Sequence, residues 1–290
     1  MHGYRLTRRG KFALMMIVML VSIAGTLGLK NIAVASDKSE YLINNSSYLS
    51  SPNSEFDELD LIKSAVAFNL VMRNSDINEK EGFLSISVED IKSYNKSKVA
   101  FLTFDDGPTE NITPVILDIL DEYNIKATFF VLGSMCERND VELNDIYKKG
   151  HSIGIHSYTH DFNHLYKNEE NFLNELKMTQ NVLKQKLGEE FNTRLFRFPG
   201  GSFEGYKSQY MDALNEAGYV SIDWNAVTGD TEMLNPTPEK LLNRLKLTTK
   251  NKNNIVVLMH DSATKQVMAE TLPDVIEYLK SDGYEFAILK

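Results

Sequence analysis

The sequence predicts an α/β fold, an incomplete (β/α) barrel preceded by an N-terminal apolar helix and a linker. From Lys98 onward, short strand-like runs alternate with longer helix-like runs, and such alternation is typical of a parallel sheet covered by helices. Clusters of Asp, His and Arg follow several strand-like runs. In barrels of parallel strands, functional residues gather at the C-terminal ends of the strands. About 190 residues supply ample core for one such domain.

The expected strands are short runs rich in β-branched, aromatic and aliphatic residues, as buried strands are. They cover residues 99–104, 127–132, 152–156, 195–198, 219–224, 255–259 and 286–289. The expected helices are the longer runs between them, with apolar residues at helical spacing. They cover residues 113–123, 141–149, 169–187, 208–217, 238–249 and 267–281. Because only seven strands are expected, we expect the barrel to be incomplete.

The first 35 residues form a targeting segment. A basic flank is followed by an almost purely apolar run at residues 12–29 and by a small-residue stretch, Ala33-Val34-Ala35, that resembles a cleavage site. The apolar run lies at the lower length limit for crossing a bilayer. The segment 1–35 is therefore either a cleaved signal peptide or a retained membrane anchor. Both alternatives place the rest of the chain outside the cytoplasm, secreted or held at the membrane.

Residues 36–97 are expected to form a linker that contains one helix. The first part, residues 36–54, is rich in Ser and Asn and poor in large apolar residues. Residues 55–73 carry apolar side chains at helical spacing, whereas residues 74–97 are polar and poorly periodic. The α/β domain is therefore expected to occupy residues 98–290.

Two carboxylates follow the first strand-like run. Asp105 and Asp106 come directly after residues 99–104 and directly before Gly107-Pro108, which is a strong turn signal. Adjacent residues of a strand point to opposite faces. The two carboxylates can therefore share one site only if the strand ends there and the chain turns.

Two imidazoles follow the third strand-like run. The i,i+4 spacing of His156 and His160 is expected to bring them together on one helical turn. With one carboxylate, they make a ligand set that suits Zn²⁺ best, with Co²⁺ or Mn²⁺ as alternatives. A metal with three protein ligands and an open position activates water, and a second carboxylate beside it can take the proton. This pattern predicts a metal-assisted hydrolase.

Two later motifs also close β-rich runs. The four motifs, in order, cover residues 103–107, 156–160, 197–201 and 258–261. This order resembles the polysaccharide deacetylases, also called carbohydrate esterase family 4 or NodB-homology domains. The resemblance spans residues 98–290. It implies a distorted (β/α) barrel and the metal-dependent deacetylation of a polysaccharide.

The resemblance also implies roles for the charged residues. Asp106, His156 and His160 match the metal ligands of the family. Asp105 matches the general base, and Arg197 matches the residue that orients this base. A neighbouring arginine is expected to keep such a carboxylate ionised.

Other family positions concern the leaving group and the substrate. His260 matches the general acid that protonates the leaving amine, which amide hydrolysis requires. Gly200 matches the backbone N–H donor to the oxyanion, although the family often carries an aromatic residue there. Leu258 matches a wall of the pocket for the acetyl methyl group. Tyr158, between the two histidines, is a candidate substrate contact, with simple packing as the alternative.

The partner of the acid histidine is ambiguous. The family uses the Asp of an Asp-Trp pair, and this chain offers both Asp223-Trp224 and Asp230-Thr231. The spacing, and the position beyond the strand-like run 219–224, favour Asp230, which would leave Thr231 in place of the tryptophan. The alternative is Asp223, with Trp224 as a pocket wall.

The formal net charge is −9, and no basic patch occurs outside the N-terminus, so a nucleic-acid partner is not expected. A neutral cell-wall glycan is compatible with this charge. We therefore expect an exported deacetylase acting on N-acetylglucosamine units of peptidoglycan, with chitooligosaccharides and acetylated xylan as alternatives. A different class, a non-catalytic wall-glycan-binding domain, is disfavoured because the complete set of ligands, base, acid and arginine is present.

Overall fold

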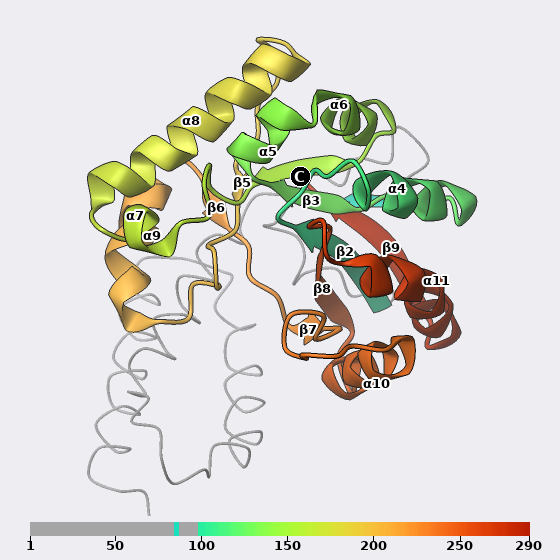
Figure 1. The fold of residues 1–290 in the computed structure, drawn as a ribbon. Helices are drawn as coiled ribbons and strands as arrows, with labels where there is room; N and C mark the ends of the chain where they lie inside the picture. The colour runs from blue at the N-terminus through green and yellow to red at the C-terminus, as the bar shows by residue number, and fades with distance from the viewer. Residues whose placement is uncertain (1–83, 87–97) are drawn as a thin grey trace, which may run out of the picture. The chain divides into compact units, whose positions relative to one another are not determined.

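The computed structural model describes residues 84–86 and 98–290, and these residues form an α/β domain around a curled parallel sheet (Figure 1). The predicted targeting segment and the predicted helix at 55–73 lie outside the described residues. Within the described part of the chain, no helix combines the length and the apolar character needed to cross a membrane.

The sheet is built around β2 (Lys98–Asp105), which is buried along almost its whole length. The other strands are β1 (Leu84–Ile86), β3 (Thr128–Val131), β4 (Ser152–Ile155), β5 (Leu195–Phe196), β6 (Val220–Ser221), β7 (Ala226–Val227), β8 (Asn254–His260) and β9 (Tyr284–Leu289). Strand β8 pairs with β2 from Val99 to Asp105. The start of β2 also pairs with β9, and its end pairs with β3.

From β3 the sheet continues through β4 and β5 to β6, and on the other side β8 pairs with β7. All pairings between the described strands are parallel. No pairing among them joins β6 to β7, so the sheet curls but does not close. The expected incomplete barrel is therefore a half-barrel.

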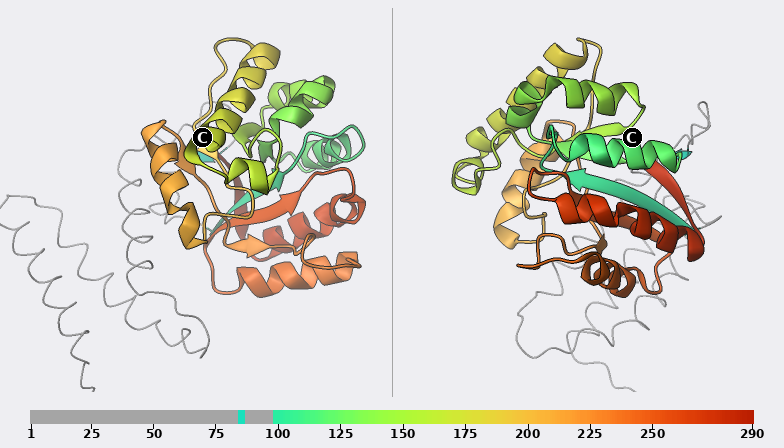
Figure 2. Two further views of the ribbon diagram at one scale, coloured as in Figure 1. Left: turned by 60° about the vertical axis from the view of Figure 1, so that its left-hand side comes forward. Right: turned by 45° about the vertical axis from the view of Figure 1, so that its right-hand side comes forward.

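Helices cover the outer side of the sheet (Figures 1 and 2). They are α4 (Thr113–Glu122), α5 (Gly133–Arg138), α6 (Asp140–Lys148), α7 (Phe162–Leu165), α8 (Glu169–Leu187), α9 (Ser208–Glu216), α10 (Pro238–Thr249) and α11 (Gln266–Ser281), with a 3₁₀ turn, η3 (Gly205–Lys207). Neighbours along this outer layer are α10, α11, α4, α6, α8 and α9, in that order. Aliphatic and phenylalanine side chains between this layer and the sheet form the main core, because both surfaces must bury their apolar faces.

Local signals explain the longest helix. The Asn168 side chain accepts a hydrogen bond from the Asn171 N–H, which caps the N-terminus of α8. The helix ends at Gly188, whose φ of 110° is accessible to glycine at little cost. Its apolar residues face the core at helical spacing, as the sequence predicts.

The six expected helices and seven expected strands are all present, with ends that differ by a few residues at most. The elements that were not expected are the short ones, β1, β7, α5, α7 and η3, because two to six residues carry too little periodicity to be recognised. Strand β1 lies within the range expected to be a linker and pairs with β9. That expectation is wrong for residues 84–86, which belong to the sheet.

Candidate functional site

The turn after β2 places two carboxylates at the edge of the sheet. Strand β2 ends at Asp105, and Asp106 has a φ of 80°, a left-handed conformation that Asp tolerates better than most residues. The expected strand end and turn are confirmed. Gly107 follows, and a Cβ there would lie 2.0 Å from Oδ2 of the buried Asp261, so only glycine fits at this position.

The two histidines meet in a loop, not on a helix. His156 directly follows β4, and helix α7 begins only at Phe162. The loop between them folds back because Ser157 and His160 have φ values of 103° and 61°. The Ser157 hydroxyl also accepts the His160 N–H at 3.0 Å. The expected helical turn is therefore wrong, although the two side chains do come together.

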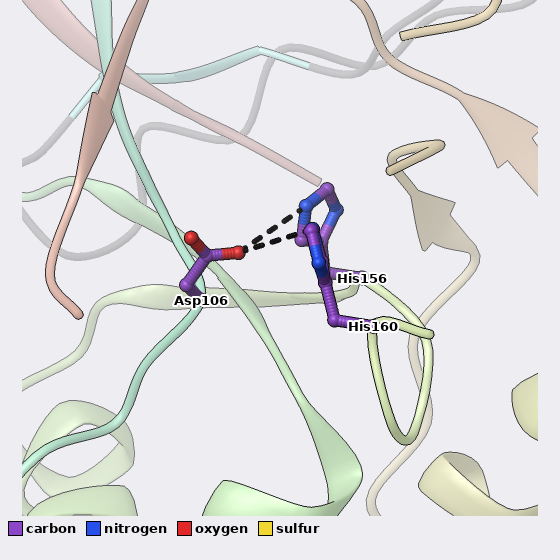
Figure 3. Close-up of side chains that lie close together, drawn as sticks. All are labelled: Asp106, His156 and His160. Atoms are coloured by element: carbon purple, nitrogen blue, oxygen red, sulfur yellow. Dashed lines mark ion pairs between the residues drawn. The ribbon is translucent and has the colours of Figure 1, made fainter. Parts of the chain in front are cut away.

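Asp106, His156 and His160 point toward one another (Figure 3). Asp106 Oδ1 lies 3.6 Å from His156 Nε2 and 3.5 Å from His160 Nε2. One ligand atom from each residue lies within 4.8 Å of the other two. Separations of this size suit three ligands around one ion, each about 2 Å from it.

Two further observations fit a divalent metal at these residues. Asp106 Oδ1 is buried without a hydrogen-bond partner, which is costly unless a cation compensates it. His156 Nδ1 lies 2.8 Å from the Arg197 carbonyl, which can only accept, so Nδ1 carries the proton and Nε2 keeps its lone pair. Burial lowers the pKa of His156 to about 3, which favours the neutral imidazole that binds metals.

The second carboxylate is held by a fully buried arginine. Arg197 Nη1 donates to Asp105 Oδ1 at 2.8 Å and to Thr103 Oγ1 at 2.7 Å, and its Nε donates to the Ile222 carbonyl at 2.9 Å. The other oxygen of Asp105, Oδ2, lies 3.8 Å from His156 Nε2. Asp105 therefore borders the metal-ligand cluster without belonging to it.

The ionisation of Asp105 differs from the expectation. Burial raises the pKa of Asp105, and although the charge of Arg197 and its hydrogen bond lower the pKa, the net direction is upward. The expected effect of the arginine is present, but desolvation of the carboxylate outweighs it. A raised pKa makes the carboxylate a stronger base once it is ionised.

His260 stands beside this cluster because β8 pairs with β2 in a register that sets it opposite Asp105. Its Nδ1 lies 3.1 Å from both carboxylate oxygens of Asp230, and its backbone N–H donates to Asp230 Oδ2 at 3.0 Å. Burial lowers the pKa of His260, but the hydrogen bond and charge of Asp230, together with Asp105 and Asp106, raise it above its ordinary value.

The alternative carboxylate has other partners. Asp223 accepts hydrogen bonds from the backbone N–H and the hydroxyl of Ser202. In the structure Asp230, not Asp223, therefore contacts His260. Trp224 lies near Arg197, with its ring centroid 5.7 Å from the guanidinium carbon.

The residues expected near the substrate have varied surroundings. Gly200 is exposed, with a φ of 75°, in the loop after β5. Leu258 is buried on β8. The Tyr158 hydroxyl donates to Glu137 at 2.8 Å, and its ring packs over Gly133, contacts that support packing for this residue.

One contributor to the site was not identified from the sequence. The Asp261 carboxylate accepts from the Thr113 hydroxyl at 2.6 Å, and its backbone N–H donates to the Asp105 carbonyl at 3.0 Å. Burial raises the pKa of Asp261 to about 7. Asp261 follows His260 in the fourth motif, but no local signal in the sequence shows that its side chain packs against Gly107.

The chain is similar to known proteins of one family. Residues 92–222 match a family model described as polysaccharide deacetylase. The chain is 36% identical over 196 residues to a peptidoglycan-N-acetylglucosamine deacetylase of Bacillus cereus, a match that covers 65% of this chain and 68% of that protein. A carbohydrate esterase family 4 esterase from Streptococcus mutans superimposes with a TM-score of 0.66 at 38% identity, covering 73% of this chain and 94% of that one.

Another similar structure is described as a pseudoenzyme of the same esterase family. This protein from Bacillus anthracis superimposes with a TM-score of 0.58 at 26% identity, covering 67% of this chain and 65% of that one. Similarity of fold therefore does not by itself establish catalysis, which depends on the side chains of the site.

Proposed function

This chain belongs to the polysaccharide deacetylase family, and from that premise we propose that it hydrolyses the acetamide of N-acetylglucosamine units in peptidoglycan, releasing acetate and leaving a free amine. One observation carries the proposal. Three candidate metal ligands, a carboxylate held by a buried arginine and a histidine held by a buried carboxylate form one continuous cluster. A domain that only binds glycan would not need all of these groups.

Asp106, His156 and His160 would hold the divalent metal, with Zn²⁺ as the first choice and Co²⁺ or Mn²⁺ as alternatives. When bound, such an ion polarises the acetyl carbonyl and lowers the pKa of water. The hydrogen bond from His156 Nδ1 to the Arg197 carbonyl orients this ligand and selects its tautomer.

Asp105 would act as the general base that takes the proton of the attacking water. Arg197 fixes the direction of its carboxylate through the 2.8 Å contact, and burial strengthens it as a base. His260 would act as the general acid. Because Asp230 raises its pKa, the imidazole is still protonated when the leaving nitrogen needs a proton.

The substrate side of the site completes the proposed reaction. The backbone N–H of Gly200 would donate to the oxygen that becomes negative in the transition state. Leu258 would line the pocket for the acetyl methyl group. A left-handed conformation at Gly200 is available to glycine without strain, so the loop can present this N–H.

The wall glycan is proposed as the substrate for two reasons. The similar protein from Bacillus cereus is a peptidoglycan-N-acetylglucosamine deacetylase, and the N-terminal segment has the pattern of an export signal or membrane anchor. The protein would then work outside the cytoplasm, secreted or held at the membrane by residues 1–35.

Mass spectrometry of glycan fragments tests the proposed reaction. The full-length protein, supplied with Zn²⁺, should remove acetyl groups from peptidoglycan fragments faster than from chitooligosaccharides. If the protein releases acetate only from acetylated xylan, the proposed amide hydrolysis is wrong and the protein is an ester hydrolase. Absence of any deacetylation in the metal-loaded protein would overturn the proposal and favour a binding role.

Substituting each of the two adjacent carboxylates in turn distinguishes the proposed general base from the proposed metal ligand. Asp105→Asn should keep the metal and lose about 10²–10⁴-fold in turnover, the usual cost of removing a general base. Asp106→Asn should bind the metal more weakly. Metal analysis combined with turnover of both variants decides the assignment, and the reverse pattern would mean that the two roles are exchanged.

A further inference from the structure

Exposed aromatic side chains are concentrated beside the proposed site. In the described part of the chain, four aromatic residues are exposed by more than a third, namely Tyr147, Phe162, Phe203 and Tyr206. All but Tyr147 surround the loop that contains Gly200. Large exposed apolar groups beside a polar site commonly mark a ligand-binding surface.

Phe162 connects this loop to the metal ligands. Its ring centroid lies 5.3 Å from that of His160, and a Cβ built on Gly200 would approach the ring to 3.1 Å. The ring is nevertheless 42% exposed. Phe162 therefore lies between a candidate ligand and the proposed oxyanion donor, with part of its ring open to solvent.

Phe203 lies against the next residue of the same loop. A Cβ on Gly201 would come within 2.5 Å of the Phe203 ring. The ring meets Trp224 edge to face at 5.3 Å, and it is still 56% exposed. Gly201 is therefore needed for this close approach, and more than half of the Phe203 surface stays open to solvent.

A buried lysine stabilises the loop that contains Gly200 and Gly201. Lys207 is 1% exposed, and its Nζ donates to the carbonyls of Pro199 at 3.0 Å and Gly201 at 2.6 Å. The same ammonium lies 4.8 Å from the centre of the Tyr166 ring, and Tyr166 in turn contacts Tyr206 at 5.9 Å. The exposed aromatic rings therefore lie on or beside a loop whose backbone Lys207 stabilises through hydrogen bonds.

We propose that Phe162, Phe203 and Tyr206, here called the aromatic rim, bind sugar units adjacent to the unit that reacts. The rim then selects a β-linked N-acetylhexosamine chain of several units over a monosaccharide or disaccharide. When the sugars of such a chain have the gluco configuration, as N-acetylglucosamine has, every ring substituent is equatorial, so each sugar has flat faces of axial C–H groups that can pack on an aromatic ring. The proposal rests on the proposed function, because it concerns the substrate of the same site.

Kinetics as a function of glycan length test the rim. Phe203→Ala should raise KM for N-acetylchitopentaose and for a peptidoglycan tetrasaccharide about threefold to tenfold, the range expected for one lost aromatic contact. Its kcat on both oligosaccharides should stay within about twofold of the wild-type value, because the rim is proposed to bind the neighbouring units and not the unit that reacts. Phe203→Tyr should restore KM.

Tyr147→Ala is the matched control. Tyr147 is an exposed aromatic on α6, 45% accessible, and it contacts Phe191 and not the loop. This variant should leave KM unchanged at every chain length. Two results would overturn the proposed role of the aromatic rim in sugar binding. One is a wild-type KM that does not depend on glycan length, and the other is an equal KM for Phe203→Ala and the wild type.

Binding without turnover provides a second readout. Trp224 is the single tryptophan of the chain, and its contact with Phe203 should make its fluorescence respond when a sugar covers that ring. The full-length Asp105→Asn variant should therefore show a saturable fluorescence change with both oligosaccharides. Titration calorimetry should give a Kd about threefold to tenfold higher after Phe203→Ala is added.

The two measurements separate the rim from the reaction. Saturable binding that depends on Phe203, in a protein whose wild type deacetylates no glycan, would support the rim and overturn the proposed function. Deacetylation with no effect of Phe203→Ala on Kd or KM would support the function and overturn the rim. Absence of saturable binding of both oligosaccharides would also overturn the rim.

Discussion

Arg197 shows how one side chain connects the fold to the site. It is fully buried, it donates to Asp105, Thr103 and the Ile222 carbonyl, and its guanidinium carbon lies 4.1 Å from the centre of the Phe130 ring. Its own carbonyl accepts from His156. The same residue therefore orients the proposed base with its side chain and a metal ligand with its backbone.

Arg197→Met is expected to lower the free energy of unfolding by about 3–5 kcal/mol, because it leaves the buried Asp105 carboxylate unpaired. Chemical denaturation measures this loss. The double variant Arg197→Met/Asp105→Asn should recover part of it, since no unpaired charge remains. A double variant as unstable as the single one would show that packing, and not the buried charge, is the cause.

Asp230→Asn is expected to move the alkaline limb of the kcat/KM profile to lower pH. A general acid works only while protonated, so this limb follows the pKa of His260. Asp230 raises this pKa and burial lowers it, so removing the carboxylate charge leaves burial to dominate. The expected shift is downward, and pH–rate profiles measure it.

Asp223→Asn is the matched control, because Asp223 contacts Ser202 and not His260. Its alkaline limb should stay at the wild-type position. A limb that moves in Asp223→Asn and stays in place in Asp230→Asn would reverse the assignment of the histidine partner.

At the scale of elements, α8 supports the loop that carries the histidines. Glu175 on α8 is 2% exposed and accepts hydrogen bonds of 2.8 Å from the N–H groups of Tyr158 and Thr159 and from the Thr159 hydroxyl. These two residues lie between His156 and His160. The next long helix along the chain therefore fixes the loop that brings the metal ligands together.

Glu175→Gln is expected to weaken metal binding about tenfold to a hundredfold, as the loss of an outer-shell partner commonly does. An amide cannot accept with both of its terminal atoms, so at least one loop donor is left unsatisfied. Competition with a chelator measures the affinity. Glu170→Gln, an exposed position on the same helix, should leave it unchanged, and equal affinities in both variants would contradict the proposed support.

Secondary structure was predictable where an element is long enough to show its period. Helix α8 carries a clear apolar face and a capping residue, so its ends were predicted to the residue. Strand β7 has only two residues, and it forms because β8 offers an edge, a fact that no local window contains.

At the scale of the whole molecule, the parallel sheet assembles the site. Asp106 follows β2, His156 follows β4, Arg197 follows β5 and His260 ends β8. The C-terminal ends of parallel strands meet at one edge, so residues spread over more than half of the chain form a single cluster.

Metal binding is therefore expected to stabilise the whole domain. Zn²⁺ at about 100 times its Kd should add about 2.7 kcal/mol to the free energy of unfolding, seen as a rise in Tm. His156→Ala should abolish this rise. His164→Ala, which removes an exposed histidine outside the ligand cluster, should keep it, and a rise that persists in His156→Ala would refute the ligand assignment.

The sequence by itself determined the order of the elements, the turn after Asp105 and the residue types of the site. These properties depend on a few neighbouring residues, whose backbone preferences and periodicity are local. It did not determine that His156 and His160 meet through a left-handed loop, because the side chain of Glu175, on the following helix α8, holds that loop in place.

The sequence favours Asp230 but leaves Asp223 as an alternative, and tertiary structure decided which of the two contacts His260 and in which direction the pKa of Asp105 moves. Asp230 and Asp223 are both acidic residues near the end of the same strand-like run, and only the packing of β7 and β8 brings one of them to the histidine. The pKa of Asp105 depends on how much water the surrounding core excludes. Burial is a property of the assembled fold, created by residues far apart in the chain, so no local pattern contains it.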